Sequence, residues 1–122
     1  MMHVKTSVQR SSVHGLGLFA EQDIGKGRVV YTANPKLDVV ISEAEFNLLQ
    51  KEEREYVAHY GYLKAGKWHL AHDDIRFCNH SDNPNITASG NRIIAKQDIS
   101  KGEELLQDYR DFEELREELR TQ

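Results

Sequence analysis

The stretch Arg76-Phe77-Cys78-Asn79-His80-Ser81-Asp82-Asn83-Pro84-Asn85 places a dense run of polar side chains directly behind a short apolar entry. Asparagine and aspartate hydrogen-bond to nearby backbone and tolerate turn conformations, and proline excludes a helix interior or a central strand. The stretch therefore predicts a tight, ordered polar loop, and such loops commonly carry functional residues. Taken alone, the same residues are more often a structural turn with a hydrogen-bonded interior histidine, so the rest of the chain decides between the two interpretations.

The composition is that of one globular domain covering residues 1–122. No apolar run approaches the roughly 20 residues that span a bilayer, and residues 1–10 lack the apolar core of a secretory signal. We therefore expect an intracellular protein without membrane contact. Cys78 is the only cysteine, which excludes an internal disulfide or a cysteine-based zinc cluster within one chain. The net charge of −4 disfavours direct binding to nucleic acid and favours basic partners.

An internal repeat relates residues 20–30 to residues 95–105. Both copies place an Asp-Ile pair before a Lys-Gly turn and an extended run. Each copy is therefore expected to form a strand, a turn ending in glycine and a second strand. Further short strands are expected at residues 4–8 and 17–20. The sequence predicts a mostly β protein with quasi-repeated hairpins.

A helical insert is expected between the two copies, over about residues 42–59. Ser42 is the expected N-cap, and Glu45 three residues later completes a capping box. Two short strands at residues 60–63 and 67–70 should follow it. A charged, amphipathic helix is expected near the carboxyl end, at about residues 111–120.

Several familiar kinds of site are missing from the sequence. Residues 15–17 form a Gly-x-Gly without the third glycine and following helix of a dinucleotide fingerprint, so they are either a plain hairpin turn or a close approach of backbone to a ligand. His59, His69 and His72 lack the spacing of metal ligands, and no metal is expected. The usual motifs of serine hydrolases and of nucleotide phosphoryl transfer do not occur.

Three motifs remain, and they occur in a fixed order: Gly15-Leu16-Gly17-Leu18-Phe19-Ala20, residues 76–85, and Gly102-Glu103-Glu104-Leu105-Leu106-Gln107-Asp108-Tyr109. In this order the chain resembles the SET-domain protein lysine methyltransferases. That family carries a Gly-x-Gly-Val/Leu-Phe-Ala opening, an Arg-Phe-x-Asn-His-Ser-x-x-Pro-Asn block and a Gly-Glu-Glu-Leu-Thr-x-Asp-Tyr close. The resemblance covers nearly the whole chain, and its central block is the most specific part. It implies a β-clip fold of small curved sheets, in which the terminal segment passes through a preceding loop like a pseudoknot.

The resemblance also implies a cofactor, S-adenosylmethionine, from which a methyl group passes to a lysine amine. The glycine turn would approach the methionine end of the cofactor, the Asn-His pair would hold it, and the preceding Arg-Phe pair would brace it. A terminal aromatic residue would stack on the adenine. The cofactor-binding residues implied in this way are Gly15, Leu16, Gly17, Arg76, Phe77, Asn79, His80 and Phe112.

On the substrate side, the resemblance makes Tyr109 the catalytic tyrosine, with its hydroxyl between the departing sulfur and the incoming amine. Tyr60 or Tyr62 would line the lysine channel, although both are equally well explained as tyrosines that pack a sheet. Gln107 occupies a position that is often Phe or Tyr in the family and that influences how many methyl groups are added. Leu106 replaces the usual threonine.

Other departures bear on partners. The family's cysteine-rich zinc segment is absent after the last motif, so residues 111–122 would close the site alone or with a partner subunit in a homodimer. The expected substrate is a lysine-containing protein with a basic tail, such as a histone or ribosomal protein. An alternative is a SET-like module that binds such tails with little or no turnover. The expected location is the cytoplasm, or the nucleus in a eukaryotic host.

Overall fold

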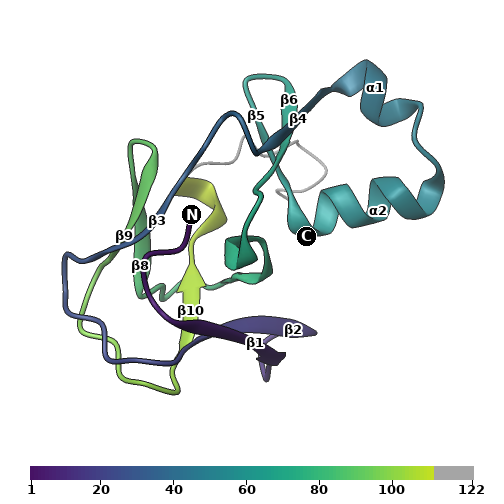
Figure 1. Ribbon diagram of the computed structural model, residues 1–122. Helices are drawn as coiled ribbons and strands as arrows, with labels where there is room; N and C mark the ends of the chain where they lie inside the picture. The colour runs from purple at the N-terminus through teal and green to yellow at the C-terminus, as the bar shows by residue number, and fades with distance from the viewer. Residues whose placement is uncertain (112–122) are drawn as a thin grey trace.

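The computed structural model describes residues 1–111. The chain forms three small sheets (Figure 1). The first sheet contains, in spatial order, β1 (Thr6–Arg10), β2 (Leu16–Ala20), β10 (Glu104–Gln107) and β7 (Asn79–His80). The second contains β3 (Val29–Thr32), β9 (Arg92–Ala95) and β8 (Ile86–Ser89). The third contains β4 (Val39–Ser42), β6 (Lys67–Leu70) and β5 (Tyr62–Lys64). The mostly β class with short helices is confirmed.

The two copies of the repeat do not form separate hairpins, and that prediction was wrong. The strands flanking the first turn are β2 and β3, and those flanking the second are β9 and β10. Pairing is crosswise, since β2 pairs with β10 and β3 with β9. Between these pairs, Ile24 and Ile99 exchange two backbone hydrogen bonds of 2.8 Å. Each turn leads the chain from one sheet into another, so each strand finds its partner in the other copy.

The polar residues of the repeat serve the same crosswise contact. The backbone N–H of Lys101 donates to Asp23 Oδ1 at 2.9 Å, and that of Lys26 donates to Asp98 Oδ1 at 2.8 Å. The glycine that ends each turn has a positive φ, 88° in the first copy and 94° in the second, where a side chain would be strained. The Asp-Ile and Lys-Gly pairs therefore join the two copies to each other.

The helical insert is interrupted, unlike the single helix expected over residues 42–59. It consists of α1 (Glu43–Asn47) and α2 (Lys51–Tyr60). Gln50 is the reason for the break: its backbone is extended, and its N–H donates to Glu53 Oε1 at 2.7 Å. This contact starts a second helix where the first ends.

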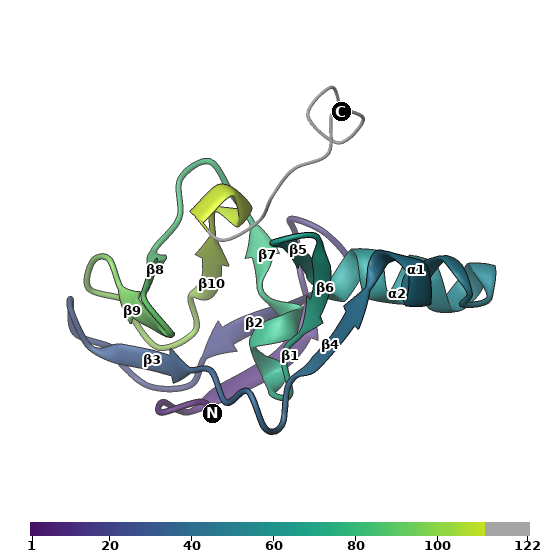
Figure 2. The same cartoon turned by 90° about the horizontal axis from the view of Figure 1, so that it is seen from above.

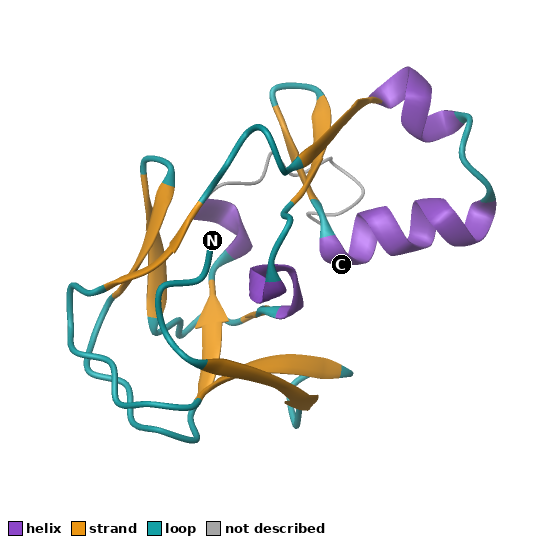
Figure 3. Ribbon diagram, in the orientation of Figure 1, coloured by secondary structure: helices purple, strands orange, loops and turns teal. Residues whose placement is uncertain are grey.

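The capping box predicted for the first helix is confirmed. Glu45 N–H donates to Ser42 Oγ at 3.1 Å, and Ser42 N–H donates to Glu45 Oε1 at 2.9 Å. Both helices lie beside the third sheet (Figure 3). Their apolar side chains join a separate small core around Phe46 and Trp68, whose rings stack at 4.8 Å between centroids.

The main core lies where the first two sheets meet. Its fully buried members come from both copies of the repeat and from the strands that flank them. The largest of them are Leu18, Ile24, Val30, Ile86, Ile99 and Leu105. Removing such side chains from water is the dominant stabilising term in folding.

The last strand lies against the polar loop at residues 76–85. β10 runs parallel to β7, between β7 and β2 (Figure 2). Asn85 also binds the backbone of β10: its Nδ2 donates to Glu104 O at 2.9 Å, and its Oδ1 accepts from Leu106 N at 2.8 Å. Ser81 N–H donates to Gln107 O at 2.9 Å. Asn85 is therefore more than a turn residue, because it fixes the strand that leads to Tyr109.

Other expectations have mixed outcomes. The strand expected at residues 4–8 is observed as β1, two residues later, and Tyr60 ends α2 instead of beginning a strand. The expected helix at 111–120 and the expected adenine contact of Phe112 lie outside the described residues, apart from Asp111 at the end of η2 (Tyr109–Asp111). In the described part of the chain, no helix is long and apolar enough to cross a bilayer.

Candidate functional site

The glycine turn and the polar loop meet through the side chain of Asn79. Its Nδ2 donates to His14 O at 3.0 Å, to Leu16 O at 3.1 Å and to Glu104 Oε2 at 3.0 Å. The carboxylate of Glu104 also accepts from Ser11 Oγ at 2.8 and 2.9 Å. Asn79 is buried, so this network ties the first and third sequence motifs to the second. Hydrogen bonds to a charged acceptor of this kind are stronger than neutral ones.

The two glycines of the turn have different reasons to be glycine. Gly15 has a φ of +45°, while a Cβ built on it would meet nothing within 4 Å. Gly17 lies in β2, and a Cβ there would stand 2.3 Å from Glu104 Oε2. Leu16, between them, remains 47% exposed. The turn therefore has an open outer side and a crowded inner side.

Tyr109 follows β10 at the start of η2. Its hydroxyl donates to Cys78 O at 2.8 Å, and its backbone N–H donates to His80 Nδ1 at 3.1 Å. The rings of Tyr109 and His80 lie 5.2 Å apart. The polar loop thus fixes both the backbone and the hydroxyl of the tyrosine.

Three charged side chains, those of Asp82, Asp108 and Arg110, lie around His80 on the outer side of this loop. Arg110 Nη2 lies 2.7 Å from Asp108 Oδ2 and 3.3 Å from Asp82 Oδ1. His80 Nε2 lies 3.4 Å from Asp82 Oδ1. Hydrogen bonds from the Arg110 side chain lower the pKa of Asp108 to about 2, so this carboxyl is ionised at neutral pH.

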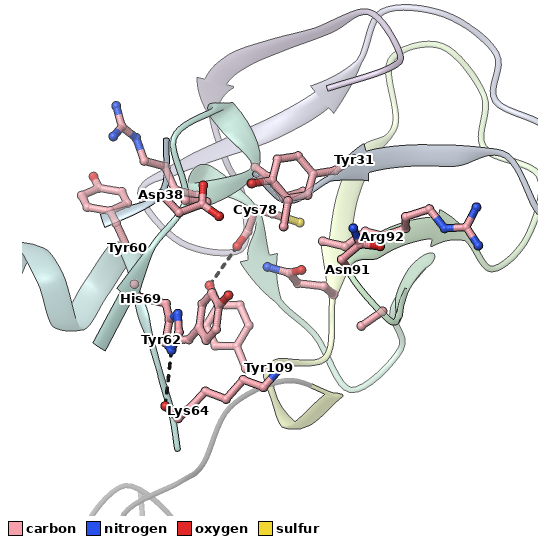
Figure 4. A pocket seen from close by; sticks show the side chains of 18 of the residues that line it. Tyr31, Asp38, Tyr60, Tyr62, Lys64, His69, Cys78, Asn91, Arg92 and Tyr109 are labelled. Atoms are coloured by element: carbon pink, nitrogen blue, oxygen red, sulfur yellow. Dashed lines mark hydrogen bonds between the residues drawn. The ribbon is translucent and has the colours of Figure 1, made fainter. Parts of the chain in front are cut away.

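A cavity of about 330 Å³ opens next to the Tyr109 hydroxyl (Figure 4). Four tyrosines contribute to its wall: Tyr31, Tyr60, Tyr62 and Tyr109. The polar and charged residues of the wall include Asp38, Gln107, Lys64, Arg76 and Arg92.

Three polar groups on residues of the wall are buried and have no hydrogen-bond partner among the described residues. They are the hydroxyl of Tyr31, Oε1 of Gln107 and Nε of Arg76. Burying a polar atom without a partner costs free energy, so such atoms usually serve a function or bind something. Their residues line a cavity that is large enough for a ligand.

The aromatic residues at the end of α2 connect the cavity to the polar loop. The Tyr60 ring meets the Phe77 ring edge to face at 5.3 Å, and it meets the His59 ring at 4.5 Å. Arg76 lies with its guanidinium carbon 5.3 Å from the centre of the Phe77 ring. Tyr62 stacks on His69 at 5.1 Å.

The structure brings the candidate residues together in two groups. Tyr109, Tyr60, Tyr62, Gln107 and Arg76 line the cavity. The turn at residues 15–17 and the Asn-His pair form the second group, joined by the Asn79 amide. Because that amide is committed to protein acceptors, any cofactor contact through it stays a prediction, as do the other assigned cofactor contacts.

Sequence reasoning missed Tyr31 and Asp38. Tyr31 follows the extended run of the first repeat copy, and Asp38 lies in the loop after it, so each resembled an ordinary strand or loop residue. Only the crosswise pairing of β3 with β9 carries them toward Tyr109. Within residues 1–111, no group of three or more His, Cys, Asp or Glu residues is placed to hold a metal ion.

Comparison with known proteins adds a family match. The model of the SET domain matches residues 15–110. The H3 lysine-36 specific histone-lysine N-methyltransferase of Candida albicans is 32% identical over 86% of this chain, and that of Aspergillus oryzae is 28% identical over 88%. The chain spans only 14% and 12% of the lengths of these two relatives.

Solved structures share the fold. The complex ctPRC2, in an autoinhibited conformation bound to S-adenosylmethionine, contains a chain with a TM-score of 0.69 and 27% identity, covering 97% of this chain and 17% of the other. A candidate histone methyltransferase of Plasmodium falciparum gives a TM-score of 0.65 at 23% identity, covering 88% of this chain and 95% of the other.

Proposed function

Because the chain belongs to the SET-domain family, we propose that it is an S-adenosylmethionine-dependent protein-lysine methyltransferase. The observation that carries the proposal is the Tyr109 hydroxyl, oriented by Cys78 O at 2.8 Å beside a cavity walled by tyrosines. An oriented hydroxyl beside a cavity with aromatic walls suits a reaction that depends on alignment more than on proton transfer.

The residues of the second group fit the cofactor. The outer side of the glycine turn is open, as the empty space at a Gly15 Cβ indicates, and the Leu16 side chain is exposed beside it. The side chain of His80, which follows Asn79, is 39% exposed. When bound, S-adenosylmethionine supplies an electrophilic methyl group attached to a sulfonium. The turn at residues 15–17, His80 and the Arg76-Phe77 pair would hold it.

The cavity would prepare the substrate lysine. A free lysine side chain has a pKa near 10.4, and desolvation disfavours its charged form. The aromatic faces of Tyr60 and Tyr62 would exclude water from the lysine stem and lower its pKa, so that more of it is the neutral nucleophile. The tyrosine faces also attract whatever cationic form remains.

Tyr109 and Cys78 would then align the reacting atoms. The phenolic oxygen and the Cys78 carbonyl oxygen are electron-rich and lie together, so they can contact the electron-poor methyl group through weak C–H···O contacts. Holding reactants in line is worth on the order of several kcal/mol of barrier reduction.

Gln107 would influence how many methyl groups are added. Its Oε1 is buried in the cavity wall without a partner among the described residues, so it would accept an N–H of the substrate amine. Each methyl group replaces one N–H, and the last addition removes this hydrogen bond. We therefore expect Gln107 to favour the lower methylation states.

The substrate class and setting are part of the proposal. The net charge of −4 favours a basic protein segment, and the curated relatives bear the name of histone H3 lysine-36 methyltransferases. A histone-like or ribosomal tail in the cytoplasm or nucleus fits both observations. A homodimer, in which the partner helps to close the site, is a further part of the proposal.

The direct test combines calorimetry with S-adenosylmethionine and a methyl-transfer assay on core histones and ribosomal proteins, read by mass spectrometry. Tyr109→Phe should lower kcat at least tenfold while the cofactor Kd changes little. Tyr56→Phe, which removes an exposed hydroxyl from α2, is the matched control. Folded protein that binds no cofactor would refute the proposal. Cofactor and tail binding without product would favour the alternative of a non-catalytic binding module.

A further inference from the structure

One end of the cavity contains a carboxylate that the proposed chemistry does not use. Asp38 lies in the loop between β3 and β4, and His72 holds it from the segment after β6. His72 N–H donates to Asp38 Oδ1 at 3.1 Å, and His72 Nδ1 lies 2.7 Å from the same oxygen. The two side chains are only 12% and 15% exposed. The carboxylate is therefore fixed in place and largely removed from solvent.

The second carboxylate oxygen of Asp38, Oδ2, has no such partner among the described residues. Within residues 1–111, Oδ2 accepts no hydrogen bond, and no cation other than His72 lies within 4 Å of the carboxylate. Asp38 is also the only carboxylate among the described residues that line the cavity. Oδ2 is therefore the oxygen of Asp38 that is free to accept a hydrogen bond from a ligand.

The hydroxyl of Tyr31 is part of the same end of the cavity. Its residue is 4% exposed, and the hydroxyl has no partner among the described residues. Burial and the nearby charge of Asp38 raise the pKa of Tyr31, so the phenol stays neutral. A carboxylate oxygen and a phenolic oxygen thus stand together at the cavity wall, both able to accept hydrogen bonds.

This end of the cavity is separate from the reacting end. Figure 4 shows Asp38 and Tyr31 on one side of Cys78, with Tyr62, Lys64 and Tyr109 on the other. The volume of about 330 Å³ is within the range that holds drug-sized ligands, which exceeds the need of one linear side chain.

We propose that Asp38 and Tyr31 form a recognition site for an arginine side chain close to the target lysine in the substrate. The planar guanidinium has several donors in a fixed fork, so it can reach Asp38 Oδ2 and the Tyr31 oxygen together, whereas an ammonium is a compact point charge. The Tyr31 ring also offers an aromatic surface beside the carboxylate. This inference rests on the proposed function, because it names a preference of that same substrate site.

The test uses nine-residue peptides of alanine, glycine and serine with one central lysine and one arginine, moved through every flanking position. Binding to the full chain is measured by fluorescence anisotropy with saturating S-adenosylhomocysteine. Arginine at one position should tighten binding about tenfold relative to citrulline, its neutral isostere, since charged hydrogen bonds contribute on this scale. If no position distinguishes arginine from citrulline on the unaltered protein, the inference is wrong.

A double-mutant cycle then assigns the effect to Asp38. Asp38→Asn keeps the shape of the side chain and should remove most of the gain from arginine, while Glu52→Gln, which removes an exposed charge on α2, should preserve it. An arginine gain that persists undiminished in folded Asp38→Asn would overturn the inference. Because binding is measured without turnover, arginine coupling in the absence of methyl transfer would contradict the proposed function alone, and methyl transfer without arginine coupling would contradict this inference alone.

Discussion

Substituting alanine for Gly17 gives a sharp test of how the glycine turn is held. The added Cβ would stand 2.3 Å from Glu104 Oε2 and 3.0 Å from Ser11 Cβ. The backbone of Gly17 lies in β2, paired with Gln9, so the cost is steric and does not come from a forbidden φ. The carboxylate of Glu104 must therefore move.

Its movement breaks contacts that the structure shows directly. Glu104 would leave Ser11 Oγ, at 2.8 and 2.9 Å, and Asn79 Nδ2, at 3.0 Å. Losing a hydrogen bond to a charged group costs about 1.5 to 3 kcal/mol, and overpacking alone about 1 to 3 kcal/mol. Since water recovers part of the first cost, we expect Gly17→Ala to lower the free energy of unfolding by about 3 kcal/mol in total.

The assay is urea unfolding followed by the fluorescence of Trp68, the only tryptophan, which is buried. Gly25→Ala is the matched control, because a Cβ there meets nothing within 4 Å and its φ is not positive. The control should match the unaltered protein within about 1 kcal/mol or exceed it slightly. If Gly17→Ala were as stable as Gly25→Ala, the carboxylate of Glu104 could not be packed tightly against Gly17.

Three further outcomes are expected. Burial raises the pKa of the Cys78 thiol, so iodoacetamide at pH 8 should alkylate it only in denaturant, which mass spectrometry would detect; rapid labelling of the folded protein would contradict this. Arg110 lowers the pKa of Asp108 to about 2, so the stability contributed by this carboxylate is present above about pH 4 and is lost as the pH falls toward 2. The free energies of unfolding of the unaltered protein and of Asp108→Asn should therefore converge across that range. Parallel curves for the two proteins would argue against this contribution of Asp108. Ser42→Ala removes the cap that binds Glu45 N–H and should cost about 1 kcal/mol in urea unfolding, so an unchanged midpoint would show that the cap is dispensable.

The order of the motifs predicted which segments of the chain would meet. Tyr109 and the polar loop were expected to meet, and the hydrogen bond from Tyr109 to Cys78 O joins them. The family, the mostly β class and the capping box at Ser42 are confirmed. Each of these depends on local chemistry or on a motif long enough to be specific.

What escaped prediction depends on contacts between distant segments. The repeat looked like two hairpins because each copy has the local signals of a turn, and nothing local indicates that Ile24 pairs with Ile99. The break at Gln50 was hidden because glutamine is a good helix former, and only the Glu53 contact reveals its capping role. Asp38 carries no motif, so its place at the cavity depends wholly on tertiary structure.

The crosswise pairing of the repeat also explains how one small domain assembles a site from distant segments. The first copy begins at the end of β2, the strand that contains Leu16 and Gly17, and ends with β3, which contains Tyr31. The second copy ends with β10, which delivers Gln107 and then Tyr109. Because β2 pairs with β10 and β3 with β9, the reciprocal bonds between Ile24 and Ile99 fix the glycine turn, Tyr109 and the Tyr31 end of the cavity relative to one another. The repeat therefore positions the site as well as forming part of the core. A change at Ile24 or Ile99 should move the Tyr109 end and the Tyr31 end of the cavity together.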